Sequence, residues 1–103
     1  MKVSKKEELF FSTLNFSQAP KITISPPGPQ AQKLLARQKK VDSNALVYPY
    51  QVPLAPEKGL GATVIDADQN VYIDFSGGVG VLNVGHSNPD VVEAIKTQAE
   101  KIT

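Results

Sequence analysis

The chain has 103 residues, of which 41% are hydrophobic and 20% charged, a balance typical of a globular domain and not of a disordered or fibrous protein. Eleven basic and ten acidic side chains leave a formal charge of +1, too weak to favour nucleic acid or an anionic membrane as a partner. The absence of cysteine excludes disulfides and thiolate metal sites, and we expect the cytoplasm by default. No stretch is long and apolar enough for a membrane span or a signal-peptide core.

Residues 1–28 predict an arm followed by a stiff connector. Charged side chains alternate with apolar ones such as Leu9 and Phe10, a pattern that fits a short amphipathic helix or a flexible arm, and we favour a mobile arm. Residues 25–29 include three prolines, which fix backbone φ and remove amide donors. We therefore place a domain boundary at residue 28, with residues 29–103 as the second unit.

A helix of about three turns is predicted for residues 30–41, because Pro29 suits a first helical position and good helix formers follow. Leu34, Leu35 and Val41 are available for a buried side. Its basic residues are interpreted as a solvated face and not as a phosphate site.

Residues 43–58 predict a loop, because three prolines there forbid a long helix and leave Tyr48 and Tyr50 in extended backbone.

A β-hairpin follows, with strands at 62–65 and 71–75 around a turn at 66–70. The alternation in the second strand predicts that its apolar residues share a buried face, and the aspartates of the turn are expected to support local backbone hydrogen bonds. The three apolar residues are Val71, Ile73 and Phe75, and the two aspartates are Asp66 and Asp68.

The last predicted element is a helix that Asn88 caps and Pro89 opens. One face would carry Val92, Ile95, Ala99 and Ile102 at helical spacing. Because nothing follows to cover that face, we expect an incomplete α+β fold: helix, small antiparallel sheet, glycine-rich loop, helix.

The glycine-rich stretch at 76–86 has four glycines, which permit positive φ or close backbone approach. Its spacing departs from the phosphate-binding P-loop and the closing Lys-Ser/Thr is missing, so nucleotide binding is not favoured. His86 is the only histidine, and with no second histidine or cysteine at ligand spacing we interpret it as a structural hydrogen-bonding residue.

Residues 59–101 resemble class III pyridoxal-phosphate aminotransferases of the 4-aminobutyrate, ornithine and acetylornithine type. The resemblance lies in an ordered series of motifs: Asp-x-Asp at 66–68, Tyr-x-Asp-Phe at 72–75, a glycine pair at 77–78, Asn-x-Gly-His at 83–86, and Pro89 opening a helix. Two positions depart from the family pattern. Gln69 stands where glycine is common, and Asn88 stands where histidine is frequent.

The resemblance implies the N-terminal, small-domain part of a fold type I homodimer, with pyridoxal phosphate bound near the subunit interface and amino acids and 2-oxo acids as substrates. At the position of Val79 such enzymes line the substrate pocket, with Gly78 and Gly80 allowing close backbone approach. Tyr48 and Tyr50 align less securely with a substrate-contacting aromatic.

The same resemblance places the Schiff-base lysine beyond this stretch, and the lysines present are interpreted as solvated. We therefore assign no catalytic, cofactor-binding or metal residue, and we expect the chain alone to bind no cofactor and to be inactive. Two alternatives stay open: an amino-acid racemase or epimerase of the same family, and a non-catalytic truncated or split-gene module that pairs with another chain.

Overall fold

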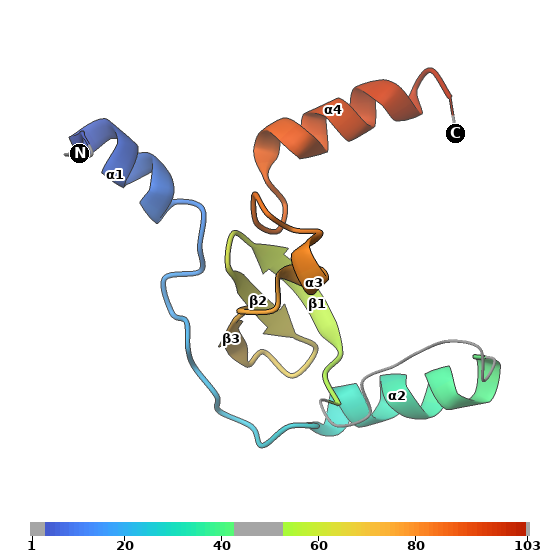
Figure 1. Cartoon of the computed structure of the whole chain (residues 1–103). Coiled ribbons are helices and arrows are strands. Elements are labelled where there is room, and N and C mark those ends of the chain that lie inside the picture. Colours follow the sequence, from blue (N-terminus) through green and yellow to red (C-terminus); the bar gives the residue numbers. More distant parts are fainter. Residues whose placement is uncertain (1–3, 43–52, 103) are drawn as a thin grey trace.

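A small antiparallel sheet forms the centre of the molecule, and three helices project from it in different directions (Figure 1). The computed structural model describes residues 4–42 and 53–102. The radius of gyration is 16.4 Å, whereas a compact domain of this length would have about 13 Å. The chain is therefore an open arrangement, in agreement with the expected α+β partial fold.

The sheet contains β1 (Pro56–Leu60), β2 (Thr63–Asp66) and β3 (Val71–Ile73), hydrogen-bonded in that order. In the β2–β3 hairpin Thr63 pairs with Ile73 and Ile65 pairs with Val71, which confirms the predicted hairpin and turn. Gln69 has φ +65°, a left-handed conformation that explains why glycine is common at this turn position in the family it resembles.

Strand β1 was not predicted, because Pro56 and Gly59 are poor strand residues. It pairs antiparallel with β2, and its register shifts between Pro56 and Lys58. A proline is tolerated there because β1 is an edge strand and Pro56 is its first residue. The predicted extended backbone at Tyr48 and Tyr50 lies outside the described residues.

Helix α2 (Pro29–Val41) confirms the predicted helix, but its predicted buried side is wrong. The buried residue of the helix is Ala31, Leu35 is half-buried, and Leu34 and Val41 are exposed. The cause lies at the helix N-terminus, where only the first turn meets the sheet: the amides of Gln30 and Ala31 donate to the Asp68 carboxylate. The rest of α2 extends away from the body (Figure 1).

The N-terminal stretch forms α1 (Lys5–Ser12) and then an extended arm that pairs with the sheet. Lys21 and Val71 exchange backbone hydrogen bonds of 2.8 Å in both directions, so the arm continues the edge of β3. The amides of Thr23 and Ile24 both donate to the side-chain oxygen of Asn70. Of the two patterns considered for this stretch, the structure shows the short helix.

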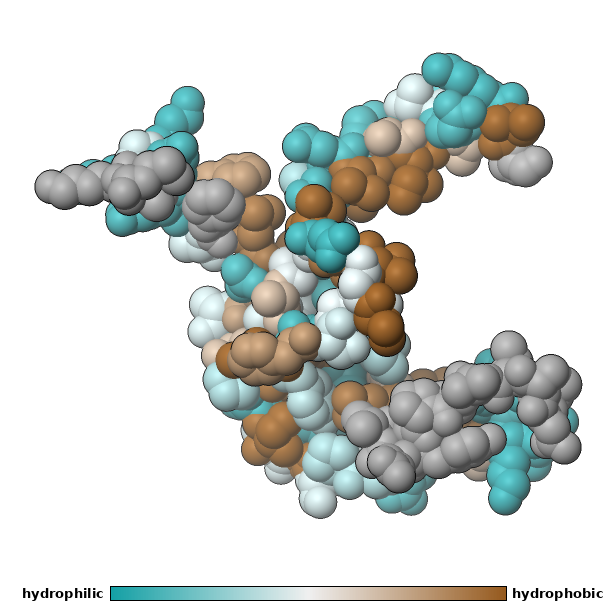
Figure 2. Space-filling model, in the orientation of Figure 1, coloured by the Kyte–Doolittle hydropathy of each residue, from teal (hydrophilic) through white to brown (hydrophobic). Residues whose placement is uncertain are grey.

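The C-terminal helix α4 (Pro89–Ala99) begins where predicted, and the Asn88 side chain accepts from the amides of Asp90 and Val91 at 3.0 and 3.3 Å. Its Ile95 is exposed and its Val92 half-buried. Figure 2 shows apolar surface along one side of α4 and around the glycine-rich loop.

The interior at the hairpin turn is polar. Its fully buried side chains are Asp66 and Asn70, and the buried apolar residues are Val71 and Ala31. The prediction of one shared buried face on the second strand was wrong: Ile73 is 42% and Phe75 92% exposed. Regular pairing stops at Ile73, so the alternation no longer governs the next residues.

Candidate functional site

The glycine-rich loop, residues 75–85, begins and ends on neighbouring residues of the β1–β2 turn. At its start the amide of Asp74 donates to the Ala62 carbonyl at 2.8 Å. At its end His86 and Gly61 exchange two backbone hydrogen bonds of 2.8 and 2.9 Å. The two ends of the loop are thus adjacent, and surface loops held in this way on a rigid sheet are often used for binding.

Inside the loop, α3 (Gly77–Gly80) is a left-handed turn. Gly77, Gly78, Val79 and Gly80 all have positive φ, at 55°, 63°, 60° and 82°. Glycine adopts this conformation without a steric penalty, which explains the three glycines, whereas a β-branched valine there is a true outlier. Val79 is the one member of the turn with a side chain, and it is 93% exposed.

One carboxylate connects the two ends of the loop. Asp74 Oδ1 accepts from the amides of Ser76 at 2.8 Å and Gly77 at 3.0 Å, and Oδ2 lies 2.7 Å from His86 Nε2. The hydrogen bond from His86, with those from Gly77 and Ser76, lowers the pKa of Asp74 below its usual value. An ionised carboxylate only accepts, so His86 Nε2 is the donor. The interpretation of His86 as a structural residue agrees with this contact.

Two glycines outside the turn allow the loop end to lie close to the sheet. A Cβ on Gly59 would come within 2.6 Å of His86 Cγ, because the imidazole lies over that residue. A Cβ on Gly85 would come within 2.8 Å of Gly61 Cα. Gly59 and Gly85 therefore bring His86 against β1 and the β1–β2 turn.

A second polar cluster fixes the hairpin turn and joins it to α2 and the arm. Asp66 Oδ1 accepts from the amides of Asp68 and Asn70, and its Oδ2 accepts from the Tyr72 hydroxyl at 2.8 Å. Burial and the Asp66 carboxylate together raise the pKa of Tyr72 to about 12. Burial alone would raise the pKa of Asp66, but the donated hydrogen bonds outweigh it and lower that pKa. The predicted local backbone hydrogen bonds are confirmed for Asp66, whereas the Asp68 side chain accepts from the distant amides of Gln30 and Ala31 instead.

The predicted substrate-binding residues Gly78, Val79 and Gly80 thus lie together at the tip of the loop. A hollow of about 470 Å³ between α1 and the loop end is lined instead by other residues, among them Leu14, Ala62, Val84 and Asn88. Nothing described in this chain covers the tip of the loop as a second wall. The link between Asp74 and His86 was missed from the sequence, although a carboxylate and an imidazole flanking a glycine-rich loop are a usable signal.

Comparison with known proteins identifies the family. The sequence profile described as "Aminotransferase class-III" matches residues 47–103, a stretch that includes the sheet, the loop and α4. The chain belongs to the class III aminotransferase family. Enzymes of this family use pyridoxal phosphate, and the sequence resemblance to them is thereby confirmed.

Individual relatives match different lengths of the chain. The alanine/serine racemase of Pyrococcus horikoshii is 42% identical over 83 residues, which are 81% of this chain and 17% of the racemase. The probable 4-aminobutyrate aminotransferase of Bacillus subtilis is 58% identical over 45 residues, which are 44% of this chain and 10% of that protein. The present chain therefore spans a small fraction of the length of these relatives.

A solved structure shows the same arrangement of elements. It is the ornithine aminotransferase of Toxoplasma gondii, reported with partial occupancy of PLP at its active site. The likeness has a TM-score of 0.62 at 27% identity and covers 100% of this chain and 21% of the Toxoplasma chain. The open shape of this chain is therefore shared with a segment of a larger enzyme.

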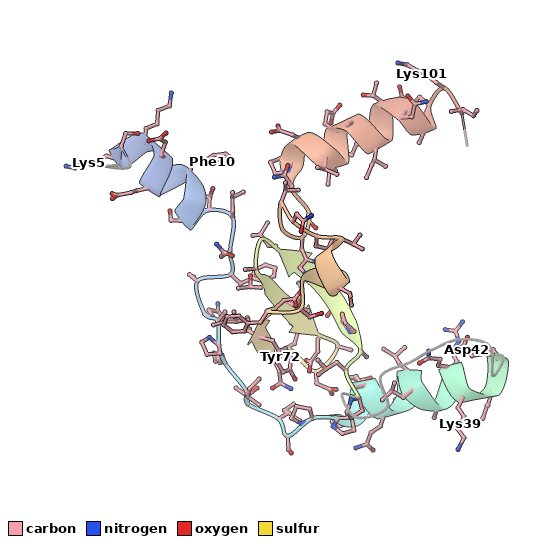
Figure 3. All side chains as sticks on the ribbon, in the orientation of Figure 1. Lys5, Phe10, Lys39, Asp42, Tyr72 and Lys101 are labelled. Carbon is pink, nitrogen blue, oxygen red and sulfur yellow. The ribbon has the colours of Figure 1, made fainter. Side chains whose placement is uncertain are left out.

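The described residues of this class III segment do not fit a complete pyridoxal-phosphate site. Such a site needs a lysine that can react with the cofactor aldehyde and a cup of donors for its phosphate. Every described lysine is exposed, and Figure 3 shows Lys5, Lys39 and Lys101 extending from or just beyond the projecting helices, away from the sheet. Within 4–42 and 53–102, no cluster of His, Cys, Asp or Glu could hold a metal ion, and no helix is long and apolar enough to cross a membrane.

Proposed function

We propose that this chain is the N-terminal, small-domain part of a fold type I aminotransferase that transfers an amino group from an amino acid to a 2-oxo acid. The observation that supports this most is the conformation of Val79, inside the family-matched stretch: a strained, fully exposed valine at the tip of a closed loop. Backbone strain of this kind occurs mostly at ligand sites, where the surrounding structure maintains it.

The role we assign to the loop is one wall of the substrate pocket. Val79 would meet the substrate side chain, and Gly78 and Gly80 would let the backbone approach without a Cβ in the way. Tyr48 and Tyr50 stay weaker candidates for an aromatic contact. The reactive lysine, the phosphate cup and the opposite wall would come from residues beyond those described, and a second subunit would complete a homodimer.

Racemisation is the second candidate, because the match that extends over 81% of the chain is to an alanine/serine racemase. The two reactions differ in whether the amino group leaves the donor. With the complete enzyme and L-alanine, transamination needs a 2-oxo acid and yields pyruvate, whereas racemisation yields D-alanine without an acceptor. Chiral chromatography of the product with and without 2-oxoglutarate distinguishes them.

The test of the pocket assignment is Val79→Phe in the complete enzyme that contains this segment. A larger side chain at a pocket wall should change the ratio of kcat/KM between a short donor, alanine, and a longer one, 4-aminobutyrate, by about tenfold or more. The matched control is Val41→Phe, which adds the same ring at an exposed position on α2.

The expected result is a changed donor ratio for Val79→Phe and an unchanged ratio for Val41→Phe. An equal loss of kcat/KM for both donors, in step with a lower melting temperature, would remove Val79 from the pocket.

A further inference from the structure

Besides the backbone hydrogen bonds at its two ends, one side-chain pair links the start and the end of the loop that presents Val79. Asp74 lies at its start and His86 at its end, and the Asp74 carboxylate hydrogen-bonds at the same time to His86 Nε2 and to the first two amides of the loop, those of Ser76 and Gly77. The two side chains are about one-fifth exposed, at 18% for Asp74 and 26% for His86. A charge-assisted hydrogen bond that is partly shielded from water is stronger than a surface contact.

The pair matters to the turn because Gly77 is both a donor to Asp74 and the first residue of the left-handed turn. The Gly77 carbonyl accepts the amide of Leu82 at 2.9 Å, which closes the turn around Val79. A left-handed conformation is unfavourable for a β-branched valine, so the turn needs an external constraint to stay populated. The Asp74 carboxylate supplies that constraint at the point where the turn begins.

We propose that Asp74 and His86 are positioning residues of the substrate site: together they keep loop 75–85 closed and thereby keep Val79 in its left-handed conformation toward the substrate. The inference rests on the proposed role of Val79 in the pocket. Neither residue touches the substrate in this account; both act through the loop.

The geometry separates this role from general support of the fold. Strands β2 and β3 pair through residues 63–66 and 71–73, before the loop begins. The backbone bridge between Gly61 and His86 does not need the imidazole. Loss of the side-chain pair should therefore loosen the loop while the sheet stays formed.

The experiment compares four variants in the complete, cofactor-loaded enzyme. Asp74→Ala and His86→Leu remove the pair, and His86→Gln retains an N–H donor at about the reach of Nε2. Asp68→Ala is the matched control, because Asp68 also accepts two backbone amides but does so at the N-terminus of α2, away from the loop. Two kinds of measurement are made. Steady-state kinetics give KM and kcat for the amino donor, and amide hydrogen exchange is followed at Gly77 and Leu82.

If the pair positions the loop, Asp74→Ala and His86→Leu raise KM for the donor about tenfold with a smaller change in kcat, since only the closed fraction binds. Exchange at Gly77 and Leu82 accelerates in both, and His86→Gln restores KM to within about threefold of the original. Asp68→Ala leaves KM for the donor and the exchange rates of Gly77 and Leu82 unchanged.

The inference is overturned if Asp74→Ala and His86→Leu raise KM no more than Asp68→Ala, or if His86→Gln behaves like His86→Leu. Its failure is distinct from that of the proposed function. If Val79→Phe changes the donor ratio while the pair variants do not change KM, the pocket assignment stands and only the positioning role is lost; if Val79→Phe leaves the ratio unchanged, the pocket assignment itself fails.

Discussion

Gln69 and Val79 both adopt a left-handed backbone conformation that side chains rarely adopt, but their surroundings differ. The Gln69 side chain donates to the Glu57 carboxylate at 2.7 Å, and its amide donates to the Asp66 carbonyl within the hairpin turn. Val79 is almost fully exposed. The strained backbone at Gln69 is thus held by contacts within the hairpin turn. The side chain of Val79 points into solvent, which is why we propose that its strained conformation has a role in substrate binding.

Gln69→Gly should stabilise the chain, because glycine adopts φ +65° without the steric cost. The gain is partly offset by the lost contact to Glu57 and by a more flexible unfolded chain, so we expect about 0.5 kcal/mol. Urea unfolding measures it. Gln38→Gly, the same change inside α2, is the control and should cost about 1 kcal/mol; a loss of similar size at both positions would contradict the role of backbone conformation.

The Tyr72 hydroxyl and Asp66 form a contact whose strength depends on pH. Because the pKa of Tyr72 is raised to about 12 from 10.0, the folded chain retains a proton that the unfolded chain releases, and this stability is present below pH 10 and is lost between about pH 10 and 12. The lowered pKa of Asp66 has the opposite effect on stability. The stability that the ionised Asp66 contributes is present above its ordinary pKa of 3.8 and is lost as the pH falls through its lower pKa in the folded chain.

Tyr72→Phe should therefore destabilise the chain at pH 7 by about 1–2 kcal/mol, because Asp66 loses a donor. Between pH 10 and 12 the difference between variant and original should shrink. The free energy of unfolding of Tyr72→Phe and of the original chain is measured at pH 7 and at pH 11.5. The difference between the two chains cancels the titration of the other tyrosines, which both chains share. A difference that is constant over this range would refute the proposed proton linkage.

At the scale of elements, the hairpin turn organises its neighbours through side chains that it shares with them. Helix α2 has Gly28 at its N-cap, which has no capping side chain, and Asp68 from the turn takes that role across 38 and 37 residues of sequence. Asn70 does the same for the arm, with its oxygen accepting two arm amides and its nitrogen donating to the Ile24 carbonyl at 2.9 Å.

Asp68→Ala should remove the cap of α2 at a cost of about 1–2 kcal/mol. The readout is amide exchange at Gln30 and Ala31, which should accelerate while that of α4 does not change. Asp68→Asn preserves one acceptor oxygen, so its exchange rates at Gln30 and Ala31 should lie between those of the original chain and those of Asp68→Ala. Equal acceleration in α2 and α4 would show that the substitution unfolds the chain generally.

Local signals predicted several elements well. Asn88 with Pro89 specified the start of α4, and Pro29 specified the start of α2. The turn residues at 66–70, between two stretches of strand-forming residues, specified the hairpin. Each of these depends on residues within a few positions of one another, so the physical cause is readable from the chain itself.

Long-range contacts and handedness were not predictable in the same way. Glycines at 77, 78 and 80 indicated conformational freedom but not that the chain turns left-handed there with Val79 included. The capping of α2 by Asp68 and the anchoring of the arm by Asn70 join residues 38 and 47 positions apart, which no local pattern encodes. The candidate loop was predicted, and the pair that links its ends, Asp74 and His86, was missed although both residues flank the glycine-rich stretch.

On the scale of the whole molecule, the chain has a polar centre and many exposed large apolar side chains. Asp66, Asp68 and Asn70 are buried, while Phe75 and Ile95 are exposed, which inverts the usual distribution of polar and apolar side chains. Within a larger class III enzyme the same surfaces would be covered, which is consistent with the small fraction of its relatives that the chain matches.

The central claim is that this segment contributes a substrate-side loop and that the reactive lysine belongs to other parts of the enzyme. The most direct measurement is titration of the pure chain with pyridoxal phosphate, followed by borohydride reduction, dialysis and peptide mass spectrometry. We predict a slow, non-saturating absorbance change and sparse label spread over exposed lysines, because each lysine in the described ranges 4–42 and 53–102 is exposed to solvent. One stoichiometric label on a single lysine, with saturation near one cofactor per chain, would contradict the account.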